Sequence, residues 1–161
     1  MQNSNFITSE DGRYLEDYVV GAVHEFGAIT VEEADIIAFA QRFDPQPFHA
    51  DPETARKSFF GGIIASGWHT VSLVMRMCVD EYLARAVSLG SPGIDELRWL
   101  KPVRPGDTLS ARVTVLQAKR SRSKPDRGVL RSYIEALNQR SEVVMTMNAL
   151  TLMVCRGPHL K

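Results

Sequence analysis

Gly67 to Ala86, GWHTVSLVMRMCVDEYLARA, is the stretch that decides the fold, because it predicts one long and mostly apolar helix. Its polar residues recur three and four positions apart, on one narrow stripe made of His69, Ser72, Arg76 and Asp80. A helix with so narrow a polar face is expected to be buried on most of its circumference. The charges within it exclude a membrane span, and no other apolar run approaches the ~20 residues that a bilayer requires.

The segments around this helix predict an α+β fold, with an antiparallel sheet wrapped around the helix. Upstream, residues 18–26 are expected to form a first strand, and Thr30 with Glu33 forms a capping box that opens a helix. That helix should end before Asp44, and Asp51-Pro52 opens a second, short helix. Downstream, four strands are expected, at residues 93–100, 108–117, 129–137 and 143–154. Nothing else in the chain is large enough to cover the long helix, and separate runs of helices and strands are typical of α+β domains.

Bulk properties indicate one domain, at residues 17–161, behind a flexible arm at residues 1–16. Hydrophobic residues make up 44% of the 161 residues, which is an ordinary balance for a globular protein. Lys+Arg and Asp+Glu both total 19, so no net charge favours a nucleic acid or an anionic membrane as partner. The polar segment Met1 to Asp11 lacks the features of a secretion signal, and we expect a cytoplasmic protein.

No metal or cofactor is expected from the sequence. Cys78 and Cys155 each lie inside an apolar run, which favours buried, reduced thiols over a disulfide or a metal site. The histidines lack paired ligand spacing, and no glycine-rich phosphate loop or dinucleotide fingerprint is present. His69 is interpreted as a hydrogen-bonded structural residue of the long helix.

The candidate chemistry lies in Phe43-Asp44-Pro45-Gln46-Pro47-Phe48-His49. Each proline fixes its own φ and biases the preceding residue away from the α region, so the segment should form a rigid loop rather than a regular helix. Asp44 and His49 stand five residues apart on it. Carboxylate and imidazole groups are among those that most often move protons near neutral pH, so the pair is a candidate acid and base.

These residues resemble the motif of the MaoC-like dehydratase family, which includes (R)-specific enoyl-CoA hydratases. The motif is an Asp, two residues, a Pro, one residue and a His, and here it runs from Asp44 to His49. Residues 61–70 and 97–107 are similar to two further stretches of the family, and the likeness covers residues 17 to 155. Gln46 stands where hydratases of the family usually have Asn. The resemblance implies the hot-dog fold, a sheet curled around a central helix.

The resemblance also implies reversible addition of water to a trans-2-enoyl thioester, which gives a 3-hydroxyacyl thioester. Asp44 and His49 would activate the water, with the roles of acid and base left open. The first amides of the long helix have no partner in the helix, so the Gly67 amide is expected to donate to the thioester carbonyl. Ser66 is the expected N-cap and a substrate contact, and Gln46 is a further candidate substrate contact.

Two other functions remain open at this point. A hot-dog thioesterase would need a carboxylate near the start of the long helix, whereas its first carboxylate is Asp80. A non-catalytic protein could bind an acyl thioester without reacting. The thioester could carry coenzyme A or an acyl carrier protein. The basic run at residues 119–127 is interpreted as a solvated loop, with contact to coenzyme A phosphates as the alternative. Dimerisation would cover an open sheet edge, so a homodimer or higher homo-oligomer is expected.

Overall fold

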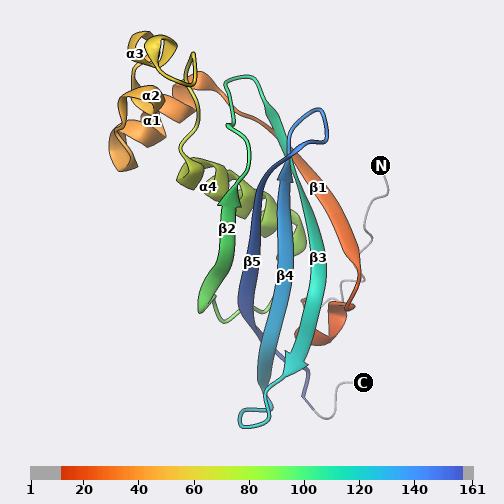
Figure 1. Cartoon of the computed structure of the whole chain (residues 1–161). Helices are drawn as coiled ribbons and strands as arrows, with labels where there is room; N and C mark the ends of the chain where they lie inside the picture. The colour runs from red at the N-terminus through yellow and green to blue at the C-terminus, as the bar shows by residue number, and fades with distance from the viewer. Residues whose placement is uncertain (1–11, 158–161) are drawn as a thin grey trace.

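The computed structural model describes residues 12–157, and in these residues one antiparallel sheet curves around a central helix (Figure 1). The sheet has five strands in the order β1-β3-β4-β5-β2. Their bounds are Val23–Thr30 (β1), Gly93–Trp99 (β2), Thr108–Arg120 (β3), Arg127–Leu137 (β4) and Val143–Val154 (β5). Every neighbouring pair is antiparallel. This is the α+β architecture that the sequence predicts.

The central helix is α4, Gly67–Met77, which begins where the sequence predicts. It continues into a π-helical turn, η2 (Cys78–Tyr82), so the helical segment ends four residues before the expected Ala86. Three further helices gather beyond one end of the sheet, near the start of α4 (Figure 1). They are α1 (Glu33–Phe43), α2 (Pro47–Ala50) and α3 (Pro52–Lys57). Asp51 caps α3 by accepting from the Glu53 amide, as its sequence predicts.

One stripe of α4 and the inner face of the sheet form the core. Val74 and Met77 of the helix are almost fully buried. On β3 the predicted alternation is confirmed, because every second side chain is buried: Leu109, Ala111, Val113 and Val115. Cys78 and Cys155 are buried free thiols, also as predicted.

The exposed side of α4 and η2 partly corrects a prediction, because it carries apolar as well as polar residues. Ser72, Arg76 and Asp80 of the predicted polar stripe are exposed, whereas His69 is buried. Trp68, Met75 and Val79 are also exposed, by 57%, 47% and 48%. The sheet ends at β2, whose Trp99 ring meets the Trp68 ring edge to face. The helix is therefore buried on one stripe, and its exposed side carries several apolar side chains.

The first strand and the helix after it also differ from prediction. β1 begins at Val23, and residues 18–22 contribute no strand. Thr30 does not cap α1, because it is the last residue of β1 and pairs with Thr108, whose hydroxyl lies 3.3 Å from its own. α1 begins after Glu32, without a side-chain cap. The pairing of Thr30 with β3 therefore prevails over the helix cap that the local sequence predicts.

The boundary of the expected N-terminal arm also shifts. Residues 1–11 lie outside the described part of the chain, but residues 12–16 pack on the domain. Arg13 donates to the carbonyl of Tyr82 at 2.6 Å, and the Leu15 side chain is 3% exposed. Within residues 12–157, no helix combines the length and hydrophobicity that a membrane span requires.

The core position on β3 makes a matched stability test possible. Leu109→Ala removes a side chain that is 0% exposed and should lower the free energy of unfolding by about 2–5 kcal/mol, through lost burial and a residual cavity. Leu116→Ala, on the same strand but 44% exposed, should cost much less. Chemical denaturation of both variants measures the difference. Equal losses would contradict the assigned faces of β3.

Candidate active site

Asp44 and His49 meet at the end of the helical cluster. Asp44 is the C-cap of α1, and His49 is the third residue of α2. The segment was predicted to be a rigid loop, but its second half forms the short helix α2. Pro47 occupies the first position of this helix, where proline is tolerated. The turn brings His49 Nε2 to 3.4 Å from Asp44 Oδ2, with both side chains mostly buried.

Two donors fix the Asp44 carboxylate. The Ser66 hydroxyl donates to Oδ2 at 2.7 Å, and the Gln46 side-chain amide donates to Oδ1 at 2.8 Å. Partial burial pushes the pKa of Asp44 upward, but these hydrogen bonds and the charge of His49 outweigh it and hold that pKa below its ordinary 3.8. Asp44 is therefore an ionised acceptor near neutral pH. Gln46, expected as a substrate contact, lies on this carboxylate in the structure.

The backbone fixes the tautomer of His49. Its Nδ1 lies 2.7 Å from the carbonyl oxygen of Ile64, and a carbonyl only accepts, so Nδ1 carries a proton. In the neutral ring, Nε2 is then an acceptor that faces Asp44. The 3.4 Å between Nε2 and Oδ2 exceeds a normal hydrogen bond of about 2.7–3.2 Å. Nε2 and Oδ2 are thus two acceptors that border the same cleft, and both can accept from a water molecule there.

The start of α4 faces the same cleft. Ser66 is its N-cap, as predicted, and its hydroxyl accepts from the Trp68 amide at 3.3 Å. Within the described residues, the Gly67 amide has no hydrogen-bond partner. A β-carbon at Gly67 would overlap the indole ring of Trp99, which lies directly on the glycine. Glycine is therefore required by this aromatic neighbour, and not only by the approach of a ligand.

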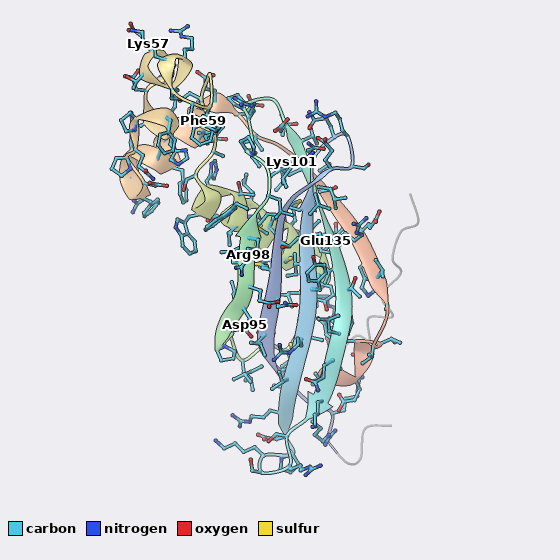
Figure 2. The ribbon with its side chains drawn as sticks, viewed as in Figure 1. Lys57, Phe59, Asp95, Arg98, Lys101 and Glu135 are labelled. Atoms are coloured by element: carbon cyan, nitrogen blue, oxygen red, sulfur yellow. The ribbon has the colours of Figure 1, made fainter. Side chains whose placement is uncertain are left out.

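An open cleft of about 450 Å³ contains these groups. Its lining joins Asp44, His49 and Gly67 to apolar side chains such as Phe48 and Trp99. Lys101 is part of the same lining and lies toward the end of the sheet nearest the helical cluster (Figure 2). The cleft thus presents an acid–base pair, an unpaired amide, an apolar wall and one cation.

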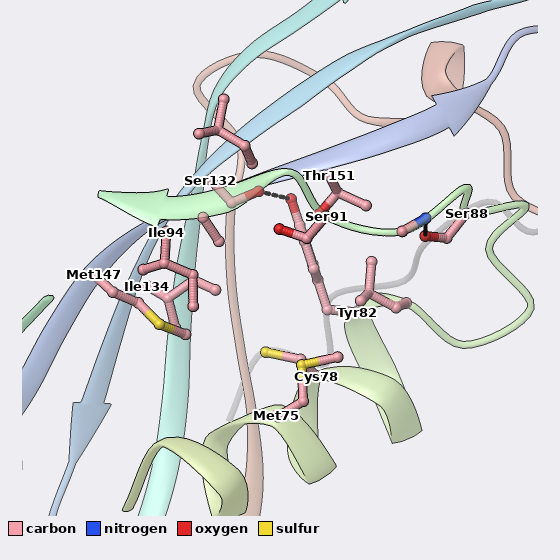
Figure 3. Close-up of a pocket in the computed structure, with 14 residues that line it drawn as sticks. Met75, Cys78, Tyr82, Ser88, Ser91, Ile94, Ser132, Ile134, Met147 and Thr151 are labelled. Carbon is pink, nitrogen blue, oxygen red and sulfur yellow. Dashed lines mark hydrogen bonds between the residues drawn. The ribbon is translucent and has the colours of Figure 1, made fainter. Parts of the chain in front are cut away.

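A second cavity of about 170 Å³ lies between the far end of α4 and the sheet (Figure 3). Met75, Ile94 and Met147 line it, and the hydroxyls of Tyr82 and Ser132 lie 2.8 Å apart within it. Burial raises the pKa of the Cys78 thiol to about 12, so this cysteine is not a nucleophile near neutral pH. No carboxylate or imidazole lines this cavity, so the groups for proton transfer all belong to the first cleft.

Other polar candidates lie outside both cavities. His69 is not hydrogen-bonded at Nδ1 within the described residues, contrary to the prediction, and stacks on Phe39 with ring centroids 4.8 Å apart. Asp80 is exposed and pairs with Arg76 at 2.8 Å. The basic run at residues 119–127 spans the β3–β4 turn, at the opposite end of the sheet from α1–α3 (Figure 1). In residues 12–157, no three His, Cys, Asp or Glu side chains group as metal ligands would.

Trp99 is the cleft residue that sequence reasoning missed. Its strand was predicted, but an aromatic side chain at the end of an edge strand carries no signal of its own. Only the pairing of β2 with β5, which sets Trp99 opposite Met145, brings the indole over the start of α4.

Comparison with known proteins agrees with this fold. The family model described as MaoC like domain matches residues 19–135. A crystal structure of the MaoC-like dehydratase from Rhodospirillum rubrum is 45% identical, with a TM-score of 0.84, over 91% of this chain and 99% of that one. Protein YdeM of Bacillus subtilis is 31% identical over 88% of this chain and 99% of its own length.

A third relative is named for a reaction. The 3-hydroxyacyl-thioester dehydratase Z of Mycobacterium tuberculosis is 36% identical over 84 residues, which are 52% of this chain and 55% of the relative. The family model and the full-length likenesses cover both the acid–base pair and the start of α4. The chain therefore belongs to the MaoC-like domain family and has its hot-dog fold.

Proposed function

We propose that this protein is a hydro-lyase that adds water reversibly to a trans-2-enoyl thioester and forms a 3-hydroxyacyl thioester. The observation that carries the proposal is the placement of Asp44 and His49, 3.4 Å apart, in one cleft with the unpaired Gly67 amide. The relative named as a 3-hydroxyacyl-thioester dehydratase supports the same reaction class. The thioester carries coenzyme A or an acyl carrier protein.

The fixed tautomer of His49 assigns the proton transfers in this proposal. Water donates one hydrogen to Asp44 and the other to His49 Nε2, and its oxygen attacks C3 of the enoyl group. His49 takes the second proton, and Asp44, which stays ionised, stabilises the imidazolium that forms. The same proton then passes from Nε2 to C2. One water proton remains on the new hydroxyl, so both new bonds to the substrate form on one face.

The Gly67 amide stabilises the intermediate charge. When the water oxygen bonds to C3, negative charge moves through C2 to the thioester oxygen, which becomes enolate-like. An unpaired amide at the start of α4 is a fixed donor for that oxygen, and the helix dipole adds to the attraction. The charge disappears when C2 takes the proton, so the amide acts most strongly between the two steps.

We further propose that a second copy of this chain covers the exposed apolar residues of α4 and η2 together with the β2 edge. Met75 of α4 and Val79 of η2 are 47% and 48% exposed, and Ile94 of β2 is 45% exposed. Within residues 12–157, β2 pairs with β5 alone, so its other edge offers backbone groups that no described strand pairs. An apolar patch beside an open strand edge is typical of an interface between copies.

Substitution of the pair tests the reaction directly. Asp44→Asn and His49→Ala should each lower kcat for hydration of crotonyl-CoA by about 10²–10⁴-fold, because the first removes the negative charge that stabilises the imidazolium and the second removes the base. Loss of the enoyl-thioester absorbance band measures the rate. Asp80→Asn is the matched control and should retain activity, because Asp80 lines neither cavity. Full activity in either pair variant would overturn the mechanism.

The pH dependence tests the hydrogen bond to Asp44. Ser66→Ala removes a donor that favours the ionised carboxylate, so the pKa of Asp44 should rise toward its ordinary value. The ¹³C chemical shift of the Asp44 side-chain carboxyl, followed by NMR as the pH is lowered, should therefore show titration at higher pH in Ser66→Ala than in the wild type. Ser72→Ala, an exposed residue of α4 whose hydroxyl donates to the Trp68 carbonyl, is the control. An unchanged titration of Asp44 in Ser66→Ala would contradict this role.

The proposed dimer is tested by placing a charged residue on each of the two edge strands of the sheet, β2 and β1. Ile94→Glu places a charge in the proposed interface and should convert the dimer to a monomer in light scattering after size exclusion. Val23→Glu places the same charge on β1, the other edge of the sheet, where the side chain is 53% exposed, and should leave the dimer intact. The reverse pattern, or a monomeric wild type, would contradict the proposed face.

A further inference from the structure

We propose that the indole N–H of Trp99 is a second hydrogen-bond donor to the thioester oxygen, beside the Gly67 amide. This inference rests on the proposed hydration function and names a further catalytic residue for it. Trp99 closes strand β2, outside the sequence motif that carries the acid and the base. It contributes neither a proton nor a covalent bond. Its role is to stabilise the charge that gathers on the thioester oxygen during the addition.

The position of the ring relative to Gly67 is the first support. The indole lies on the glycine so closely that a β-carbon there would be 2.6 Å from Nε1. In an α-helix the Cα–Cβ bond tilts toward the N-terminus, which is also the direction in which the first amides point. The indole N–H and the Gly67 N–H therefore border the same space at the start of α4, inside the cleft that holds Asp44 and His49.

The hydrogen-bonding state of the indole is the second support. An indole N–H only donates, so its partner must be an acceptor atom or a water molecule. Within the described residues, Trp99 Nε1 has no such acceptor, although the ring packs against Gly67 and lines the cleft. The side chain is 46% exposed, so water can satisfy this donor until a ligand oxygen replaces it. Two donors without internal partners thus stand beside each other in the cleft.

The packing of the ring makes the donor rigid. The Trp68 and Trp99 rings meet edge to face, with centroids 5.4 Å apart at 78°. The backbone of Trp99 is held by its pairing with Met145 of β5. A donor that is fixed before the reaction costs no reorganisation when charge develops, which is the property that oxyanion holes require. Trp68 therefore acts as a positioning residue for the indole.

Two replacements of Trp99 distinguish the effect of the N–H donor from the effect of the shape of the ring. Trp99→Phe removes the N–H and part of the ring. Substitution of Trp99 by 3-benzothienylalanine keeps the bicyclic shape and puts sulfur in place of the N–H. Loss of one oxyanion donor typically lowers kcat by about 10²–10³-fold, so both variants should show a loss of that order with crotonyl-CoA and a smaller change in KM. Thermal unfolding of the benzothienyl variant should match that of the wild type.

A spectroscopic measurement reads the hydrogen bond without turnover. Butanoyl-CoA lacks the double bond, so its thioester carbonyl, labelled with ¹³C, reports binding alone. The carbonyl stretch should fall in frequency when the ligand binds the wild type, and this fall should be smaller in the benzothienyl variant. A benzothienyl variant with wild-type kcat and a wild-type carbonyl band would overturn the proposal, and would show that only the shape of the ring matters.

The two measurements distinguish this proposal from the proposed function. If the wild type does not hydrate crotonyl-CoA, the hydration function fails, while the carbonyl band of bound butanoyl-CoA still decides whether Trp99 donates. If the wild type hydrates crotonyl-CoA and neither kcat nor the band responds to loss of the N–H, the Trp99 proposal alone fails. A wild type that binds neither thioester would overturn both.

Discussion

The hydroxyl of Ser66 is the contact on which the rest of the site depends. A hydroxyl has one hydrogen to donate and two lone pairs, and here it donates to Asp44 while it accepts from the Trp68 amide. The first bond fixes the acid, and the second fixes the start of α4. The fully buried Ser66 therefore joins the carboxylate at the end of α1 to the first turn of α4, where the Gly67 amide lies. His49 is tied to the same segment through Ile64.

This arrangement explains why acid, base and amide share one cleft although they belong to three elements. Residues 44–49 and 63–67 are held together by the Ser66 and Ile64 contacts, so a shift of either segment would move all three groups together. Gln46 completes the anchoring of the carboxylate from within its own turn. The Gln46 side chain is long enough for its amide to reach the Asp44 carboxylate at 2.8 Å.

Sequence reasoning could find those features that local chemistry determines. The start of α4, the cap at Ser66, the cap at Asp51 and the alternation of β3 each follow from a few neighbouring residues. It failed where partners come from far along the chain. The sequence around Thr30 predicts a helix cap, but in the structure Thr30 pairs with Thr108 in the sheet. Trp99 lies over Gly67 only because β2 pairs with β5. The exposure of Trp68, Met75 and Val79 was not predicted, because the apolar pattern of a helix does not show whether the same chain or a second copy covers it.

The central claim is that this cleft adds water across the enoyl double bond and leaves the thioester intact. Incubation with crotonyl-CoA in H₂¹⁸O, followed by mass spectrometry of the products, tests it directly. The account predicts 3-hydroxybutanoyl-CoA with one ¹⁸O at C3, and no free coenzyme A thiol above the level of a protein-free control. Release of coenzyme A with ¹⁸O in a free carboxylate, or no ¹⁸O-labelled product at all, would contradict it.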